Sequence, residues 1–292
     1  MNVLPRVIVP VLLGLPLLVI LIITMLPILT HPASQAQLQP QNPVLITNEP
    51  AGIVYMGPPT TALAGYYCVY QAQVSSNGWL INGVYVPTGI LMGALRLTSL
   101  VLKPGNLTGY SIQLNAVAGG YWLQDVYVYV LVNGRGVLKT LVNVWHVNNS
   151  LVAYAWGPVA RPCGWLVIRI VNDTVWFGYS GDGVGVDWYY SYPLGNTTIQ
   201  PGLMTNLVIG GPGGGRGVGF MRAYIVLALY YWNGTGWVPA PVVPTGAGEW
   251  YMYGTAEFVT RAWAYVSGNE AVVTWPGPTS QPIQVTPPQS KP

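Results

Sequence analysis

The chain has 292 residues, of which 7% are charged and 12% are aromatic, and its formal net charge at pH 7 is +3. The eleven Lys and Arg are spread singly and form no basic stripe, which argues against a nucleic-acid partner. Only eight Asp and Glu are present, so few native carboxylates have to be protonated in acid, and the composition favours tolerance of low pH.

The N-terminal segment is one apolar run, residues 7–29, which follows Arg6 and contains no charged residue. Such a run is typical of a secretory signal or an uncleaved signal anchor, and it predicts one hydrophobic helix. It is about long enough to cross a bilayer, whereas Ala36 stands at the spacing of a signal-peptidase site, so cleavage and membrane retention both stay open. In either case we expect residues 1–36 to deliver the rest of the chain outside the cytoplasm, as an extracellular or cell-surface protein.

Residues 37–275 are predicted to form a single all-β domain. Short runs of Val, Ile, Leu, Tyr and Trp are broken by Gly, Pro and Asn, and helical periodicity is absent. This spacing is typical of an antiparallel β-sandwich, of the jelly-roll or concanavalin-like kind. Strands are expected at residues 66–74, 90–102, 110–117, 122–132, 137–144, 151–156, 165–171, 174–179, 207–209, 219–232 and 250–259.

Turn signals separate the expected strands, among them Gly119-Gly120 and Asn172-Asp173. The glycine-rich run at residues 210–217 lacks the Lys-Ser/Thr ending of a phosphate loop, so we interpret it as a loop beside a cleft. The tail, residues 276–292, is rich in Pro, Gln, Thr and Ser, and we interpret it as a flexible or disordered end.

Cys68 and Cys163 are the only cysteines, and an oxidising exterior permits a disulfide between them. A single histidine outside the N-terminal segment, His146, and scattered aspartates predict no metal site, and no cofactor motif is present. Five Asn-x-Ser/Thr sequons indicate exposed loops and are candidate glycosylation sites: Asn106, Asn148, Asn172, Asn196 and Asn233.

Polar side chains follow one face of the expected hairpin at residues 110–132. Alternation puts Gln113 and Asn115 on the face opposite Ile112 and its aliphatic neighbours. In the second strand, Asp125 and Tyr127 share one face, while Gln124 stands in the opposite, aliphatic file. Strand parity therefore predicts that Gln124 points away from the other polar residues.

A second acidic residue, Glu257, lies in the expected strand at residues 250–259, where alternation places it in file with Tyr253. A Tyr-lined face that carries Asp125 and Glu257 would suit an extended polymer, with Asn115, Tyr127 and Tyr253 as contact residues. Paired carboxyls in such a cleft could share a proton and activate water. The alternative is a merely solvated sheet face, because such faces are often rich in Tyr and Thr.

Several pieces of the sequence, in order, resemble motifs of thermopsins, the secreted acid endopeptidases of heat- and acid-loving archaea. The resemblance spans most of residues 66–260 and rests on the order and spacing of these pieces. They are Pro87-Thr88-Gly89-Ile90, residues 112–117, residues 121–126, the glycine-rich residues 207–220 with Tyr230-Tyr231-Trp232 after them, and residues 253–257. The resemblance implies hydrolysis of a polypeptide substrate at low pH by carboxyl-type chemistry, without a cofactor.

A looser analogy concerns glutamic peptidases, which also use a β-sandwich, with a Glu as general base and a Gln that holds the oxyanion. By that chemistry Glu257 would activate water and Gln113 or Gln124 would polarise the scissile carbonyl. Alternatively, Glu257 and Asp125 form a proton-sharing pair. Both versions require a carboxylate that stays ionised in acid, so we expect a pKa kept low by donors or split by a neighbour.

Two further functions stay open at this point. One is a non-catalytic cell-envelope protein that binds carbohydrate or protein through the Tyr-rich face. The other is a glycosidase that uses Asp125 and Glu257, for which the distance between the two carboxyls would be decisive.

Overall fold

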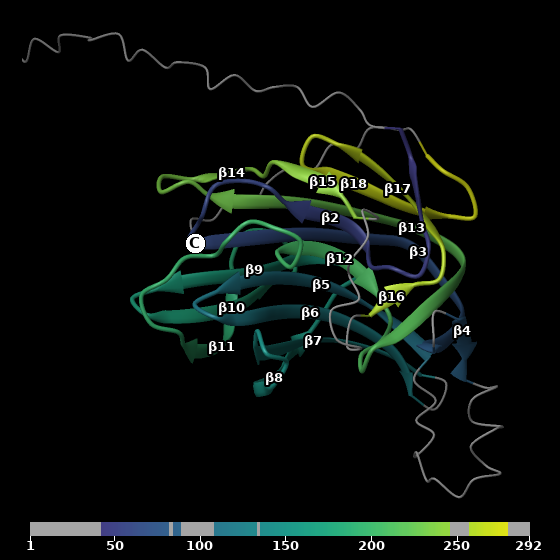
Figure 1. The fold of residues 1–292 in the computed structure, drawn as a ribbon, viewed down its shortest axis with the longest axis horizontal. Helices are drawn as coiled ribbons and strands as arrows, with labels where there is room; N and C mark the ends of the chain where they lie inside the picture. The colour runs from purple at the N-terminus through teal and green to yellow at the C-terminus, as the bar shows by residue number, and fades with distance from the viewer. Residues whose placement is uncertain (1–41, 82–83, 89–107, 133–134, 246–256, 280–292) are drawn as a thin grey trace, which may run out of the picture. The chain divides into compact units, whose positions relative to one another are not determined.

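The computed structural model describes residues 42–81, 84–88, 108–132, 135–245 and 257–279. These residues form two β-sheets in which all but one of the strand pairs are antiparallel, so the all-β prediction is confirmed (Figure 1). The apolar run 7–29, the expected strand at 90–102, Asn106, Tyr253 and most of the tail lie outside the described residues. No helix among the residues described is long and apolar enough to span a membrane.

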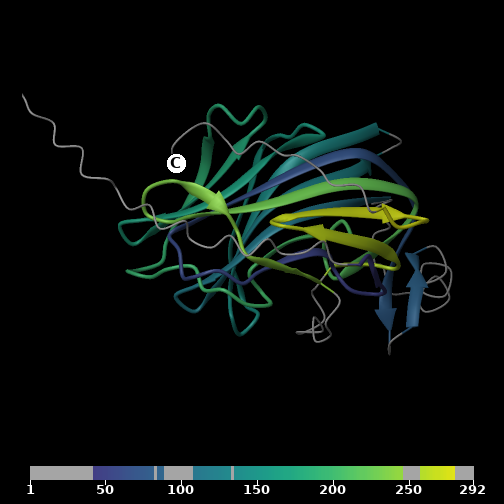
Figure 2. The ribbon, with the colours of Figure 1, turned by 90° about the horizontal axis from the view of Figure 1, so that it is seen from above.

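The larger sheet has eleven strands, and its main path runs β1-β17-β18-β13-β3-β9-β10-β11. β14 and β16 pair with β13, and β4 pairs with β3. The bounds are β1 Val44–Ile46, β3 Ala62–Ile81, β4 Val84–Pro87, β9 Cys163–Val171, β10 Thr174–Ser180, β11 Asp187–Pro193, β13 Arg216–Trp232, β14 Trp237–Pro239, β16 Phe258–Val259, β17 Ala262–Ser267 and β18 Glu270–Trp275. The far end of β3 and its partner β4 form a hairpin that extends from the body of the sheet (Figure 2, blue).

The smaller sheet has seven strands in the order β15-β2-β12-β5-β6-β7-β8. Its bounds are β2 Ala51–Tyr55, β5 Thr108–Ala118, β6 Tyr121–Val132, β7 Arg135–His146, β8 Leu151–Val159, β12 Asn206–Gly210 and β15 Val242–Pro244. The β5–β6 hairpin turns at Gly119 and Gly120, whose φ angles of 56° and 81° favour glycine. The turn predicted at this position is confirmed.

The two sheets pack face to face around one large hydrophobic core. Ile112 and Leu114 of the smaller sheet and Leu63 and Leu227 of the larger one all belong to this core and are fully buried. Aromatic contacts also cross between the layers, since the rings of Tyr67 and Tyr127 lie 4.7 Å apart.

Cys68 and Cys163 lie directly opposite each other on β3 and β9 and form a disulfide, with their Cα atoms 4.0 Å apart. The bond joins two neighbouring strands of the larger sheet. We therefore assign it a structural role.

The four sequons within the described residues all lie at exposed turns or loops. Asn148 lies between β7 and β8, Asn172 between β9 and β10, and Asn233 between β13 and β14, while Asn196 follows β11. Their expected position in exposed loops is confirmed; glycosylation itself stays a prediction.

Candidate functional site on the outer face of the smaller sheet

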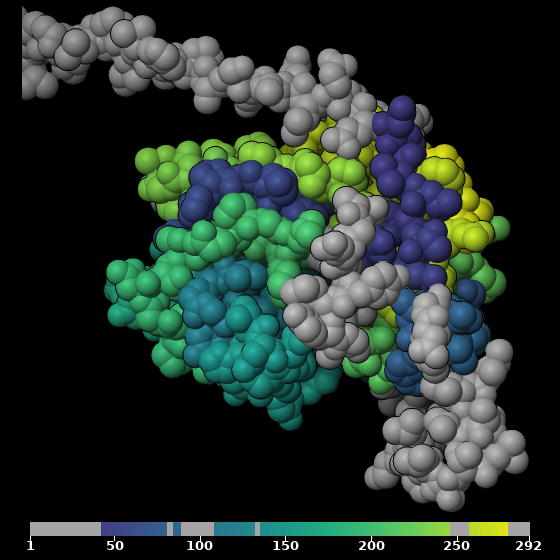
Figure 3. All heavy atoms as spheres, in the orientation of Figure 1, coloured from purple at the N-terminus to yellow at the C-terminus, as the bar shows by residue number. Residues whose placement is uncertain are grey.

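The outer face of the smaller sheet carries a row of amide side chains. The strand register pairs Asn206 of β12 with Asn115 of β5. It also pairs Asn115 with Gln124 of β6, and Gln124 with Asn143 of β7. Directly opposed residues of an antiparallel pair point to the same face, so these four side chains form a line across the strands. On the face seen in Figure 3, purple (β2), green (β12 and the segment before it) and teal (β5 to β7) bands follow one another in this strand order.

This register contradicts the prediction that Gln124 points away from Gln113 and Asn115. Asn115 opposes Gln124, and Gln113 opposes Val126, so all four lie on the outer face. The error came from assigning both aliphatic files of the hairpin to the same face. The outer face of β6 carries Val126 beside Gln124. The file that contains Asp125 and Tyr127 is buried in the core.

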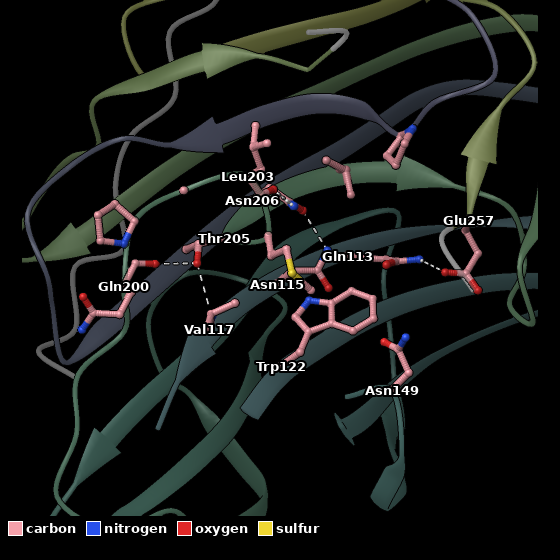
Figure 4. A pocket seen from close by; sticks show the side chains of 15 residues that line it. Gln113, Asn115, Val117, Trp122, Asn149, Gln200, Leu203, Thr205, Asn206 and Glu257 are labelled. Atoms are coloured by element: carbon pink, nitrogen blue, oxygen red, sulfur yellow. Dashed lines mark hydrogen bonds between the residues drawn. The ribbon is translucent and has the colours of Figure 1, made fainter. Parts of the chain in front are cut away.

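Glu257 reaches this face from a different part of the chain. It stands immediately before β16, which runs parallel to the start of β13. One carboxylate oxygen accepts a hydrogen bond of 2.9 Å from Gln113 Nε2, and the other accepts one of 3.2 Å from the backbone N–H of Gly215. Gln113 and Glu257 point toward one another in Figure 4. The predicted association of Glu257 with Gln113 is thus present.

The close approach of Glu257 depends on a glycine of β12. A Cβ atom on Gly210 would lie 2.6 Å from Glu257 Cβ and 2.9 Å from its backbone carbonyl carbon, closer than packed atoms allow. Two glycines of the glycine-rich segment therefore position Glu257. Gly210 leaves space for its close approach, and the Gly215 N–H donates a hydrogen bond to its carboxylate.

A continuous hydrogen-bond chain connects Glu257 with the amide row. Gln113 Oε1 accepts from Gln124 Nε2 at 3.1 Å, and Gln124 Nε2 also donates to Asn115 Oδ1 at 2.9 Å. Gln124 Oε1 in turn accepts from the indole N–H of Trp145 at 2.8 Å. Gln113, Gln124 and Asn115 are 6%, 3% and 2% exposed, so water has little access to these bonds.

Both glutamines have committed their N–H groups. A side-chain amide has two N–H donors, and Gln113 Nε2 uses them on Glu257 and on Ser111 Oγ, the latter at 2.9 Å. Gln124 uses both on Gln113 and Asn115. A bound carbonyl can therefore receive a hydrogen bond from Gln113 only if its bond to Glu257 or its bond to Ser111 opens.

Trp122 supplies a donor that sequence analysis missed. Its indole N–H is shielded from solvent and has no hydrogen-bond partner among the described residues. Burying such a group without a partner costs about 1–3 kcal/mol, and functional sites are a common place to find one. Its only sequence signal was its position two residues before Gln124, in the same file of β6.

Two hollows, of about 380 and 230 Å³, meet at these residues. The larger lies over β5 and β12 and the segment before β12, which includes Leu203 and Thr205. The smaller lies over β6 and β7 and is bordered by the glycine-rich residues Pro212, Gly213 and Gly214. Gln113, Trp122 and Glu257 line both hollows, so the two hollows meet at these three residues and together form one groove across the sheet. Figure 4 shows the larger hollow, with Glu257 at its edge. The prediction of a glycine-rich loop beside a cleft is confirmed.

Burial raises the pKa of Glu257 above its ordinary value, although hydrogen bonds from Gln113 and Gly215 and the charge of Arg216 act in the opposite direction. The expectation of a carboxylate with a lowered pKa is therefore wrong for this residue. Loss of hydration outweighs the donors, so Glu257 takes up a proton more readily than a solvated glutamate does.

Asp125 lies on β6, on the face opposite to that of Gln124, and is fully buried between the sheets. Its carboxyl accepts hydrogen bonds from the Tyr189 hydroxyl at 2.5 Å and from the backbone N–H of Val167 at 3.1 Å. Burial raises its pKa to about 8, so the carboxyl is neutral in acid. Asp125 and Glu257 thus face opposite sides of one sheet, which contradicts the predicted proton-sharing pair and the glycosidase arrangement built on it.

The prediction of a Tyr-lined binding face is wrong for Tyr127. Tyr127 is 1% exposed and packs in the core, where its hydroxyl lies 3.3 Å from that of Tyr110. Tyr253 lies outside the described residues. Asn115, the other expected contact residue within the described part of the chain, lines the groove.

Among the described residues, no three His, Cys, Asp or Glu side chains lie close enough together to hold a metal ion. His146 packs against the ring of Tyr121, with ring centroids 4.6 Å apart. In comparisons with known proteins, no family model matches the chain, and no curated protein matches it.

Proposed function

We propose that the protein is an exported, thermopsin-like acid endopeptidase in which Glu257 activates water for attack on a peptide bond. The observation that supports this most strongly is the Glu257–Gln113 pair in the middle of a groove that extends to both sides of it. A peptide bond cleaved within a chain needs room on both sides, whereas a pocket closed on one side would suit a terminal residue or a small ligand.

The proposed reaction needs one ionised carboxylate and no cofactor. Glu257 takes a proton from water while the water oxygen bonds to the scissile carbonyl carbon, and the carbonyl oxygen becomes an oxyanion. When this tetrahedral intermediate collapses, the C–N bond breaks and the leaving nitrogen takes the proton from Glu257. The carboxylate is thereby restored.

Gln113 contributes most as Glu257 gains its proton. A protonated carboxyl accepts hydrogen bonds less strongly than a carboxylate, so the Gln113 N–H can turn from Glu257 to the developing oxyanion. The donor is thus released when negative charge appears on the substrate. Trp122, whose indole N–H has no partner among the described residues, would bind a second carbonyl of the substrate backbone.

The raised pKa of Glu257 limits the pH range of this chemistry. The base works only when it is ionised, so the acidic limb of the rate profile should lie above the ordinary pKa of glutamate. The protein would then act in moderate rather than extreme acid. Within this proposal, residues 1–36 export the chain as a signal peptide or signal anchor, with the apolar run 7–29 as its hydrophobic helix. The two sheets form a sandwich of jelly-roll or concanavalin-like kind.

The test is hydrolysis of an acid-denatured polypeptide by the purified protein from pH 2 to 7, at ambient and raised temperature. We expect new peptide termini, with a rate that increases across an acidic limb above the ordinary glutamate pKa of 4.5. Asp125→Asn should retain activity, because Asp125 faces the core. Absence of cleavage at every pH and temperature would overturn the proposal.

A second candidate is a non-catalytic protein that binds carbohydrate or polypeptide in the same groove. The observation in its favour is that two indoles, Trp122 and Trp145, line the groove with ring centroids 6.4 Å apart. Under this candidate, ligand binding would be measurable by calorimetry, the ligand would be recovered uncut, and Glu257→Gln would leave its affinity nearly unchanged.

A further inference from the structure

We infer that Trp145 and Gln124 are positioning residues, which act together with Ser111 so that Gln113 presents its N–H group, and not its oxygen, to Glu257. The inference rests on the proposed function for its catalytic meaning. The orientation of the amides, however, follows from the hydrogen-bond chain itself.

A side-chain amide in a buried row can in principle adopt either of two orientations that exchange its oxygen and nitrogen. The orientation is decided by neighbours that can only donate or only accept. The row across β12, β5, β6 and β7 has one such neighbour at each end.

At the β7 end, the indole of Trp145 can only donate. Gln124 must therefore direct Oε1 toward Trp145, and the 2.8 Å bond has this direction. Asn143 Nδ2 donates to the same oxygen at 3.4 Å. Gln124 Nε2 is then left to face Gln113 and Asn115.

At the β12 end, the backbone carbonyl of Leu203 can only accept. It receives a hydrogen bond of 2.8 Å from Asn206 Nδ2, so Asn206 turns Oδ1 toward Asn115 and accepts a bond of 2.8 Å from its Nδ2. Asn115 consequently offers Oδ1 to Gln124. Both ends of the row thus require the same orientation of Gln124.

This orientation passes to Glu257 through Gln113. Gln113 Oε1 is held by Gln124 Nε2, so Gln113 Nε2 faces Glu257 Oε2. Ser111 supports the same orientation, because its hydroxyl donates to the Gly211 carbonyl and accepts from Gln113 Nε2. The reverse orientation would place an amide oxygen against a carboxylate and would favour its protonated form. Arg216 is the charged side chain that acts on Glu257 among the described residues, and its guanidinium lies over the Trp79 ring.

Because Asn206, Asn115, Gln124 and Gln113 are each at most 6% exposed, water cannot easily replace a lost donor. A change at Trp145 should therefore alter the proton affinity of Glu257 although Gln113 and Gln124 separate the two residues. A purely structural role of Trp145 predicts no such effect.

The experiment compares Trp145→Phe with Trp122→Phe. The two residues oppose each other in the register, and each variant loses one indole N–H, but only that of Trp145 holds an amide of the row. The readout is the pH titration of the Glu257 side-chain carboxyl by carbon NMR on the full chain, with its signal identified by its loss in Glu257→Gln. We expect the Glu257 pKa to rise in Trp145→Phe and to stay unchanged in Trp122→Phe.

A thermodynamic cycle tests the route. In a Gln113→Met background, Trp145→Phe should no longer change the Glu257 titration, because the connection through Gln113 is absent. If Trp145→Phe does not fold, Asn206→Leu removes the anchor at the other end of the row and should shift the titration in the same direction. Equal titrations in wild type, Trp145→Phe and Asn206→Leu would overturn the inference.

Activity separates this inference from the proposed function. If the protein is a peptidase, Trp145→Phe should lose about threefold in kcat on the acidic limb and little above it, with KM nearly unchanged. If the wild type cleaves no polypeptide while the titrations shift as expected, the proposed function fails and the positioning role of Trp145 stands.

Discussion

At the scale of single residues, the site combines a carboxylate that burial makes more basic with one cation that counteracts this effect. The guanidinium of Arg216 lowers the pKa of Glu257, and it also lies 5.5 Å from the Trp79 ring centroid. Burial is the larger influence, and the hydrogen bonds from Gln113 and Gly215, together with the charge of Arg216, limit the rise of the Glu257 pKa.

We predict that Arg216→Gln moves the acidic limb of kcat/KM to higher pH. Loss of the positive charge favours the protonated form of Glu257, so activity on this limb should fall about threefold and recover at higher pH. Arg222→Gln, at an exposed position of the same strand, is the matched control. An unchanged profile in Arg216→Gln would show that its charge does not reach Glu257.

The indole N–H of Trp122 leads to a second prediction at this scale. Trp122→Phe keeps an aromatic ring but removes the donor. We expect kcat/KM for a peptide substrate to fall about tenfold, which corresponds to the free energy of about one hydrogen bond. Trp176→Phe, at an exposed site of β10, should behave like the wild type. Equal kcat/KM values in all three proteins would remove Trp122 from substrate binding.

At the scale of elements, the strands of the site were largely predictable and the pairing of their faces was not. Alternation identified β5, β6 and β7, and the turn at Gly119-Gly120 was predicted. That two-residue turn places Ala118 opposite Tyr121 and, counted back along the hairpin, Asn115 opposite Gln124. The register was thus available from the sequence, but hydrophobicity was used instead to choose the faces.

Hydrophobicity misled because each face of the hairpin mixes polar and apolar residues. Asp125 can occupy the core because Tyr189 and Val167 of the other sheet donate to it, and a partner from a distant strand leaves no local pattern. Similarly, Val126 borders the groove on the outer face. Short strands such as β2 and β18 were missed since they are buried on both faces and do not alternate.

The contact between β12 and β16 gives a prediction that belongs to this scale. Gly210→Ala should push Glu257 away from Gln113, lowering kcat at least tenfold and stability by about 1–3 kcal/mol. Gly236→Ala is the control, because a Cβ there meets no atom within 4 Å. The measurements are kcat and urea unfolding, and wild-type kcat in Gly210→Ala would contradict the assigned position of Glu257.

At the scale of the whole molecule, the buried carboxyl of Asp125 links folding to acid. Its pKa rises from 3.8 to about 8 on folding, so the folded protein binds a proton that the unfolded chain releases between these values. Ionisation at higher pH would place an uncompensated charge between the sheets. The contribution of Asp125 therefore makes the fold less stable as pH rises.

We predict that the free energy of unfolding of the wild type falls relative to Asp125→Asn between about pH 4 and pH 8, with a slope approaching 1.4 kcal/mol per pH unit. The asparagine cannot ionise, so its contribution does not change with pH. Urea unfolding of both proteins at several pH values measures the difference. Parallel curves would show that Asp125 does not titrate in this range.

The central claim is that Glu257 is the base that activates water in the groove, and one comparison tests it most directly. Wild type, Glu257→Gln and Asp125→Asn are assayed on one peptide substrate, with peptide affinity and unfolding temperature measured alongside. We predict that Glu257→Gln loses at least a thousandfold in kcat while its affinity and unfolding temperature change little, and that Asp125→Asn stays active. Substantial hydrolysis by a folded Glu257→Gln protein would contradict the account.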